Sequence, residues 1–387
     1  MAAYTGPGRD TLSDVLDWAV VRGGAPSVAV QVQDGDGTWF DAAGTADAAT
    51  GEARAPGERL HLGGISQAYT AATVLSLEAE GRLSLDDTVE RWLPGALAGN
   101  GYDGSRVTVR HLLSHTSGLF STGMALEVQR RYGTRAAFRE HRYDVWRRED
   151  VLRLAVSEPP AGAPGERFWY STGGYAFAAA IVEAATGNSF ESEVDRAVVR
   201  PLGLTHTFVR HRADPGYWGP HPRLHSKMFF RDGVRPEDVT PDNWPSLLED
   251  PALPPLDTTK ANTSWAWGAA NVVAPLDELI VFMDALITGD LLPEAQHRAM
   301  WATESTKGAH WLAHTAYGLG VYELTLSDGR TLRGCTGAST GAHALVLGTP
   351  DGRRTLAAHV ANDYSGFPVF DRLLEAEFGA PGFAYDR

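Results

Sequence analysis

Strand-like segments lie near both ends of this chain, and a long helix-rich region lies between them. Residues 27–44 alternate apolar and polar side chains around Asp-Gly pairs, which is typical of an antiparallel hairpin, and residues 317–363 repeat the pattern. Apolar residues recur with helical spacing over residues 11–22, 67–80, 106–114, 173–186, 190–199, 276–287 and 368–378. The pattern predicts a sheet domain split in sequence, residues 1–60 and 313–387, and a mainly helical domain, residues 61–312, with the functional site in the cleft between them.

Composition narrows the classes of partner. The 387 residues include 43% hydrophobic side chains, enough for a large core, and the formal net charge is -14. This charge disfavours nucleic acid and anionic lipid, so we expect a small-molecule substrate, no nucleic-acid partner and no membrane partner. One cysteine and no basic N-terminal region followed by an apolar run predict a cytoplasmic protein without internal disulfides. The oligomeric state stays open.

A serine stands at the start of the first middle helix, in the run Gly63-Gly64-Ile65-Ser66-Gln67-Ala68-Tyr69-Thr70. Ser66 and Tyr69 are three residues apart and share a helical turn, so their side chains are expected to lie side by side. Read alone, a serine in this place is more often a helix N-cap than a nucleophile.

Four further segments favour the nucleophile. "EGRLSLDDTVERWLP" (80–94), "VTVRHLLSHTSGL" (107–119), "PGERFWYSTGGYAFAAAIVEAATG" (164–187) and "YGLGVYELTLSDGRTLRGCTGASTGAHALVLGTPDG" (317–352) occur in this order. Together they resemble the serine β-lactamase-like family, which includes class C β-lactamases, D-alanyl-D-alanine peptidases, esterases and transacylases. The resemblance implies an α/β (α+β) fold of the β-lactamase/penicillin-binding-protein type, with an antiparallel sheet flanked by helices beside an all-α domain.

The family's first two catalytic motifs occur here in altered form. Its Ser-x-x-Lys motif is matched to residues 66–69, which makes Ser66 the nucleophile and puts Tyr69 in place of the lysine. Its Tyr-x-Asn motif is matched to residues 170–172, which keeps Tyr170 and puts Thr172 in place of the amide that would hold a substrate carbonyl. Trp169, directly before this motif, is expected to line the cleft.

The third motif, Lys/His-Thr-Gly, is matched to Cys335, Thr336 and Gly337, so a thiol replaces the cation or imidazole. By the same resemblance, the main-chain N–H groups of Ser66 and Ala338 form the oxyanion hole, a role that needs only backbone. These matches predict that the three motifs converge in one cleft.

The substitutions weaken conventional acyl transfer. Without a nearby cation, a tyrosine phenol near pKa 10 is mostly neutral at pH 7, so Tyr170 would activate Ser66 poorly. Three histidines are candidates for a replacement base, His343 first and then His61 and His115. Four other histidines lie in a loop region with irregular spacing and no cysteine, so no metal and no cofactor are predicted.

Three functions remain open at this point. The first is an intracellular serine hydrolase or acyltransferase that acts on a small-molecule ester or amide through Ser66. The second is a repurposed acid–base enzyme of a biosynthetic pathway, which uses Tyr69 and Tyr170 for cyclisation, elimination or isomerisation. The third is a ligand-binding protein that has lost catalysis.

Overall fold

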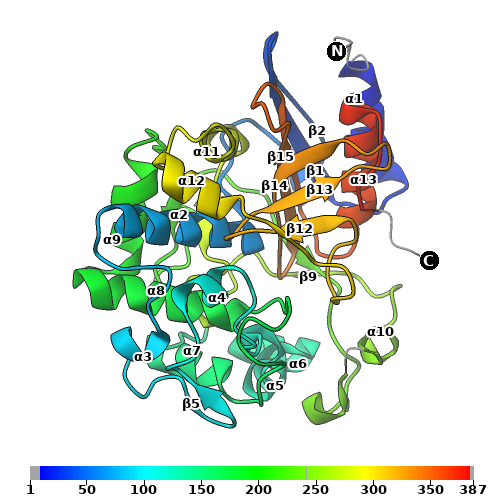
Figure 1. Ribbon diagram of the computed structural model, residues 1–387. Coiled ribbons are helices and arrows are strands. Elements are labelled where there is room, and N and C mark those ends of the chain that lie inside the picture. The colour runs from blue at the N-terminus through cyan, green and yellow to red at the C-terminus, as the bar shows by residue number, and fades with distance from the viewer. Residues whose placement is uncertain (1–8, 241, 384–387) are drawn as a thin grey trace.

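A nine-stranded antiparallel sheet joins the two ends of the chain (Figure 1). The computed structural model describes residues 9–240 and 242–383. The strand order is β11-β12-β13-β14-β15-β16-β1-β2-β3, and β1 pairs with β16 so that Val28 lies opposite Val360. The strands are β1 (Ser27–Asp34), β2 (Gly37–Asp47), β3 (Glu52–Ala53), β11 (Glu304–Ser305), β12 (Thr315–Tyr317), β13 (Tyr322–Thr325), β14 (Thr331–Ser339), β15 (Ala342–Gly348) and β16 (Thr355–Val360).

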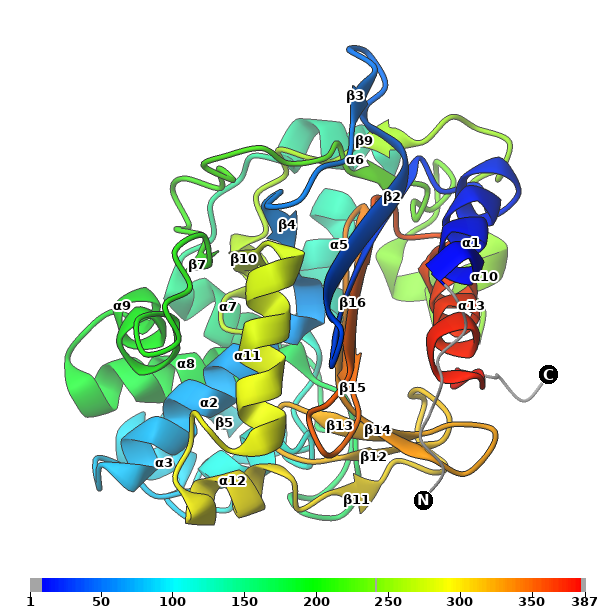
Figure 2. The same ribbon diagram turned by 90° about the horizontal axis from the view of Figure 1, so that it is seen from above.

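Helices cover both faces of this sheet (Figure 2). Side chains alternate between the two faces along each strand, so the core is divided into two clusters. On one face lie α1 (Arg9–Val21) and α13 (Gly366–Phe378), against side chains such as Leu345 and Leu347 of β15. On the other face lie α2 (Ser66–Ala79) and α11 (Leu276–Thr288), against Ala344 and Val346. Because β11 belongs to this sheet, the C-terminal part of the sheet begins before residue 313. The exact limits of the two domains stay a prediction.

Several of the remaining helices pack against α2 or α8 (Thr172–Thr186). The Ser171 hydroxyl caps α8 by accepting a hydrogen bond from Gly174 N, and Gly187, with φ of 76°, ends the helix. The other helices are α3 (Val89–Trp92), α4 (Val109–Leu113), α5 (Leu126–Tyr132), α6 (Arg135–His141), α7 (Arg148–Ala155), α9 (Phe190–Val194), α10 (Trp244–Leu247) and α12 (Glu294–Met300), with a π-helix at Asp195–Val199.

Short elements connect the two layers. Three small sheets are formed by β4 (Leu60–His61), β10 (Val272–Ala274) and β7 (Phe208–Val209), by β5 (Ala98–Gly99) and β6 (Tyr102–Asp103), and by β8 (His225–Ser226) and β9 (Leu256–Asp257). The 3₁₀ turns are η1 (Gly63–Ile65), η2 (Thr122–Met124), η4 (Pro236–Asp238) and η5 (Ser264–Ala266). Within the described ranges, no helix is long and apolar enough to cross a bilayer.

Candidate functional site

The turn η1 lies directly against β14, and glycine makes this contact possible. A β-carbon at Gly63 would lie 2.4 Å from the Ala338 carbonyl oxygen, and one at Gly337 would lie 1.9 Å from the Leu62 oxygen. Gly63 also has φ of 53°, which L side chains rarely adopt. The entry to α2 and the third motif are therefore in backbone contact.

Position 64 faces the second and third motifs. A β-carbon at Gly64 would lie 3.1 Å from Tyr170 Oη, 3.5 Å from the Thr336 carbonyl oxygen and 3.6 Å from Gly337 Cα. A side chain at this position would be in contact with Tyr170, and a small shift of the phenol would accommodate it. The position before α2 whose side chain would face Tyr170 is therefore occupied by glycine.

Gln67, one helical turn after Gly64, is hydrogen-bonded to Tyr170. Its Nε2 donates to Tyr170 Oη at 2.7 Å, and its Oε1 accepts from His115 Nε2 at 3.0 Å and from Tyr317 Oη at 3.2 Å. His115 Nδ1 accepts from the main-chain N–H of Ser171, so its proton is on Nε2 and this nitrogen donates. One amide therefore connects two buried rings, His115 and Tyr317, to the partly exposed ring of Tyr170.

This network is uncharged near pH 7. Burial raises the pKa of Tyr170 to about 12, although the Gln67 hydrogen bond partly opposes the rise, and burial lowers the pKa of His115 to about 3. Trp311 stacks on the Tyr170 ring, with 4.5 Å between centroids. Because Tyr170 Oη already accepts from Gln67, its own proton is available to a ligand acceptor.

The structure does not bring Ser66 and Tyr69 to Tyr170, and this corrects the predicted site. Ser66 is 2% exposed, and its Oγ accepts a hydrogen bond from Val272 N at 2.9 Å. Tyr69 is fully buried, and its ring stacks on that of Phe282 in α11, with 3.7 Å between the ring centroids. The two residues share a turn as expected, but that turn faces β10 and α11.

Two further facts remove them from the chemistry. The Ser66 main-chain N–H bonds to the carbonyl oxygens of Gly63 and Gly64, so it is not free to serve as an oxyanion donor. The Tyr69 hydroxyl has no hydrogen-bond partner among the residues that the structure describes, and burial raises its pKa well above 10. In place of Tyr69, Gln67 is the residue beside Tyr170.

The polar residues of the other two motifs also have structural partners. Thr172 Oγ1 bonds to Ser121 Oγ at 3.0 Å and to Thr122 Oγ1 at 2.8 Å. The Cys335 thiol is buried, donates to the Gly320 oxygen at 3.4 Å, and has a pKa that burial raises. Thr336 lies opposite Leu345, which belongs to the core under α13, so its carbonyl oxygen rather than its side chain approaches Gly64.

The histidines proposed as bases are all buried. The ring of His343 packs beside Phe367, 5.3 Å between centroids, and burial lowers its pKa to about 4. His61 Nδ1 accepts from Gly63 N, and burial lowers its pKa well below 6.5. Of the three, only His115 belongs to the Tyr170 network, and there it acts as a donor that orients Gln67.

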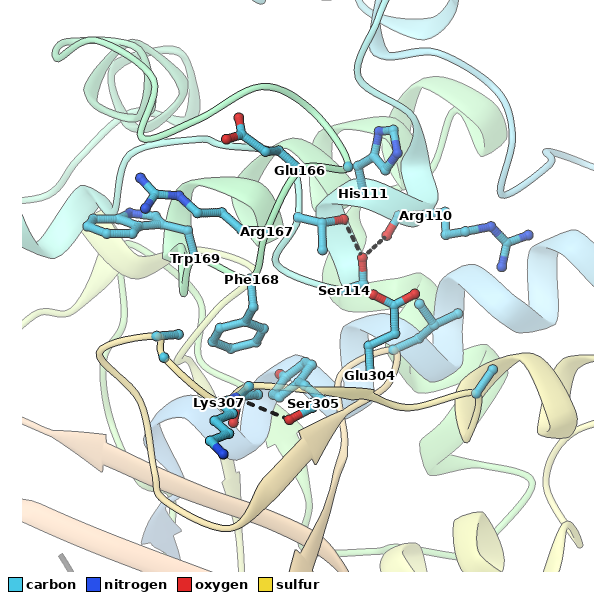
Figure 3. Close-up of a pocket in the computed structure, with 18 of the residues that line it drawn as sticks. Arg110, His111, Ser114, Glu166, Arg167, Phe168, Trp169, Glu304, Ser305 and Lys307 are labelled. Carbon is cyan, nitrogen blue, oxygen red and sulfur yellow. Dashed lines mark hydrogen bonds between the residues drawn. The ribbon is translucent and has the colours of Figure 1, made fainter. Parts of the chain in front are cut away.

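Two cavities adjoin this network. One, about 740 Å³, is lined by Tyr170, Trp311 and Trp169 among others. The second, about 660 Å³, is lined by Tyr317 and by charged side chains that include Arg110, Arg167, Glu166, Glu304 and Lys307, and Figure 3 shows it with Arg167 beside Trp169. The Gln67 amide is hydrogen-bonded to one tyrosine in the wall of each.

Sequence reasoning missed Gly64 and Gln67, although a signal was present. The two residues have the same three-residue spacing as Ser-x-x-Lys, two positions before the match that was made at Ser66. The motif was matched from Ser66 because it is a serine. The alternative match starts at Gly64, where both the serine and the lysine of the motif are replaced. The adjacent pair Gly63-Gly64 before a helix was the available indication that the backbone approaches another segment closely.

Comparison with known proteins agrees with this architecture. Residues 10–380 match the family model described as Beta-lactamase. The chain is similar to a D-stereospecific amidohydrolase from Streptomyces sp., with 30% identity, a TM-score of 0.82, and coverage of 96% of this chain and 99% of that one. It resembles the D-amino acid amidase of Ochrobactrum anthropi SV3, solved with D-phenylalanine, in fold, at 20% identity, a TM-score of 0.73, and coverage of 95% and 98%.

Two curated relatives are also similar. Penicillin-binding protein 4* of Bacillus subtilis (strain 168) is 26% identical over 334 residues, 83% of this chain and 65% of that protein. Esterase EstB of Burkholderia gladioli is 35% identical over 185 residues, 46% of this chain and 45% of that protein, so the chain spans less than two thirds of either relative. Because the family model matches residues 10–380 and the fold agrees with that of the amidohydrolase, this chain belongs to the β-lactamase family and has the β-lactamase/penicillin-binding-protein fold.

Proposed function

We propose that this chain binds a carbonyl-bearing small molecule without forming an acyl-enzyme. The observation that carries the proposal is the glycine at position 64, which faces Tyr170 Oη. Acyl transfer on this fold needs a hydroxyl and a group that removes its proton, and positions 64 and 67 offer neither a hydroxyl nor a lysine. The hydroxyl of Ser66 lies against β10 and does not replace them.

The retained groups suit a carbonyl oxygen as ligand. Tyr170 offers a neutral O–H donor whose direction Gln67 fixes. The contact of η1 with β14 puts the main chain of Gly64 next to Gly337 and Ala338, where main-chain N–H groups form the oxyanion hole in the family. We assign the donor role to Gly64 and Ala338 in place of Ser66 and Ala338. Two of the named relatives, a D-stereospecific amidohydrolase and an esterase, favour an amide or ester as the ligand of this chain.

The same donor favours a second candidate, a non-hydrolytic enzyme in which Tyr170 polarises a bound carbonyl as a general acid. Tyr69 takes no part in it, since its ring is stacked on Phe282. The variant Tyr170→Phe distinguishes the two candidate functions. This variant would weaken binding modestly in a binding protein, but would abolish conversion of the ligand in an enzyme.

Intact mass after incubation with a fluorophosphonate, which reacts with activated serine hydroxyls, tests whether the chain has such a nucleophile. We expect no stoichiometric adduct on the wild-type protein and none on Ser66→Ala. Gly64→Ser combined with Gln67→Lys should gain an adduct at position 64, and adding Ser66→Ala should not remove it. Labelling of the wild-type chain that disappears in Ser66→Ala would contradict the proposal.

Binding itself is tested by titration with a neutral aryl amide such as phenylacetamide. Trp169 and Trp311 in the cavity wall make intrinsic fluorescence a suitable signal. We expect saturable binding that Tyr170→Phe weakens by roughly fivefold to tenfold, the loss of one hydrogen bond. Cys335→Ser is the matched control, because the thiol is buried and bonded to Gly320.

A further inference from the structure

The 740 Å³ cavity beside Tyr170 has an aromatic wall. It is formed between η2, α5, η4 and the loop that carries Trp311. The side chains that give this wall its character are Phe120, Phe168, Trp169, Tyr170 and Trp311. Such a wall suits a ligand with a large apolar or planar part, and the faces of aromatic rings also attract cations.

The charges in this wall are negative. Glu158 and Glu237 line the cavity, and no lysine or arginine does so within the part of the chain that the structure describes. Glu237 is 45% exposed and lies 3.8 Å from Arg130, an exposed side chain outside the lining, so its charge is partly compensated. Glu158 is only partly exposed. Burial, with a smaller contribution from the charge of Glu158, raises the pKa of Tyr102 to about 12.

The catalytic motifs add no positive charge on this side. The two motif positions that carry a cation in the family are Gln67 and Cys335 here, an amide and a buried neutral thiol. His115 is neutral because burial lowers its pKa to about 3. The ligand therefore meets two carboxylates, a neutral phenol, the imidazole of His310 and aromatic rings, in a protein whose net charge is -14. Arg167 does not line this cavity, but its guanidinium lies 5.4 Å from the centroid of the Trp169 ring.

We propose that this cavity takes an organic cation, an ammonium group carried on an aromatic or apolar body. The ammonium would lie near Glu158 and the aromatic rings, with the body against Phe120 and Trp311. The inference rests on the proposed binding function and adds the charge and chemical class of the ligand. It excludes the carboxylate-bearing ligands that a cationic third motif would favour.

Three probes with one apolar body test the charge preference: 4-phenylbutylamine, 4-phenylbutanol and 4-phenylbutyrate, titrated at pH 7 into the full chain by calorimetry. We expect the amine to bind about tenfold more tightly than the alcohol and the butyrate to bind most weakly. Glu158→Gln should remove most of the amine's advantage and leave the affinity for the alcohol unchanged. Glu237→Gln should have a smaller effect in the same direction.

Glu304→Gln is the matched control, because this carboxylate lines the other cavity (Figure 3). Equal affinity for amine and butyrate, or a Glu158→Gln effect that is the same for all three probes, would overturn the cation proposal. In that case, alcohol binding that still depends on Tyr170 would leave the proposed binding function standing. If none of the probes binds and phenylacetamide does not bind either, both proposals fail. A thermal scan of each variant establishes that it is folded.

Discussion

Gln67→Leu is expected to destabilise the fold, because this amide is the acceptor for two buried donors. His115 and Tyr317 are 0% and 5% exposed, and both donate to Gln67 Oε1. Leucine has a similar volume but no acceptor, and a buried donor left without a partner costs about 1–3 kcal/mol. Two such donors give about 2–6 kcal/mol, and added burial of a leucine side chain returns about 1 kcal/mol. The free energy of unfolding should fall by about 1–5 kcal/mol.

Urea denaturation, followed by far-UV circular dichroism and by tryptophan fluorescence, measures this loss, and coincident transitions justify a two-state treatment. Gln31→Leu is the control: Gln31 is also buried, at 6% exposure, but it lines a different cavity, which contains no residue of the Tyr170 network. Gln31→Leu should change stability by less than about 1 kcal/mol. A Gln67→Leu loss no larger than that of the control would refute the assignment of Gln67 as the central acceptor.

Two further outcomes follow from buried groups. Tyr69→Phe should leave stability unchanged or raise it by up to about 1 kcal/mol, because the hydroxyl has no partner in the described structure while the stacked ring stays in place; a loss above about 2 kcal/mol in a melting experiment would contradict this. His343 has a pKa of about 4 when folded and near 6.5 when unfolded, so its stabilisation is complete above pH 6.5 and is lost as pH falls towards 4. Between pH 7.5 and 5 the wild-type chain should therefore lose about 2 kcal/mol more than His343→Leu in urea titrations, and parallel pH profiles would count against it.

The sequence was sufficient to predict the long elements of the fold. The expected helix at 67–80 is Ser66–Ala79, that at 173–186 is Thr172–Thr186, and that at 276–287 is Leu276–Thr288. These helices have long apolar faces and glycine stops, both of which are local in sequence. Strand patterns at the two ends were equally visible. Short elements such as η1 and β4 were not, because contacts with β10 and β14 define them.

The site was harder to predict, because a helix face is chosen by its distant neighbours. Ser66 and Tyr69 were expected beside Tyr170, but Val272 and Phe282, some two hundred residues later in the chain, contact that face. The spacing of residues along a helix determines which side chains share a face. It does not determine which other elements of the fold pack against that face. In the structure Tyr170, Thr336 and Gly337 lie beside Gly64, two positions before the serine from which the motif was matched.

Glycine at 64 and glutamine at 67 fit one another as parts of a neutral site. The Ser171 N–H fixes His115 as a donor at Nε2, and Tyr317 is a second donor at the same point. A lysine at 67 would put a third donor and a buried charge there, with no carboxylate among its contacts, which is unfavourable unless Tyr170 ionises. Glutamine instead accepts from both donors and donates to Tyr170, so the phenol stays protonated and points its proton outward. With no hydroxyl at 64 to activate, an ionised Tyr170 would have no proton to remove, whereas a neutral one can hold a carbonyl. The two substitutions together therefore change the site from one that ionises a nucleophile to one that donates a hydrogen bond.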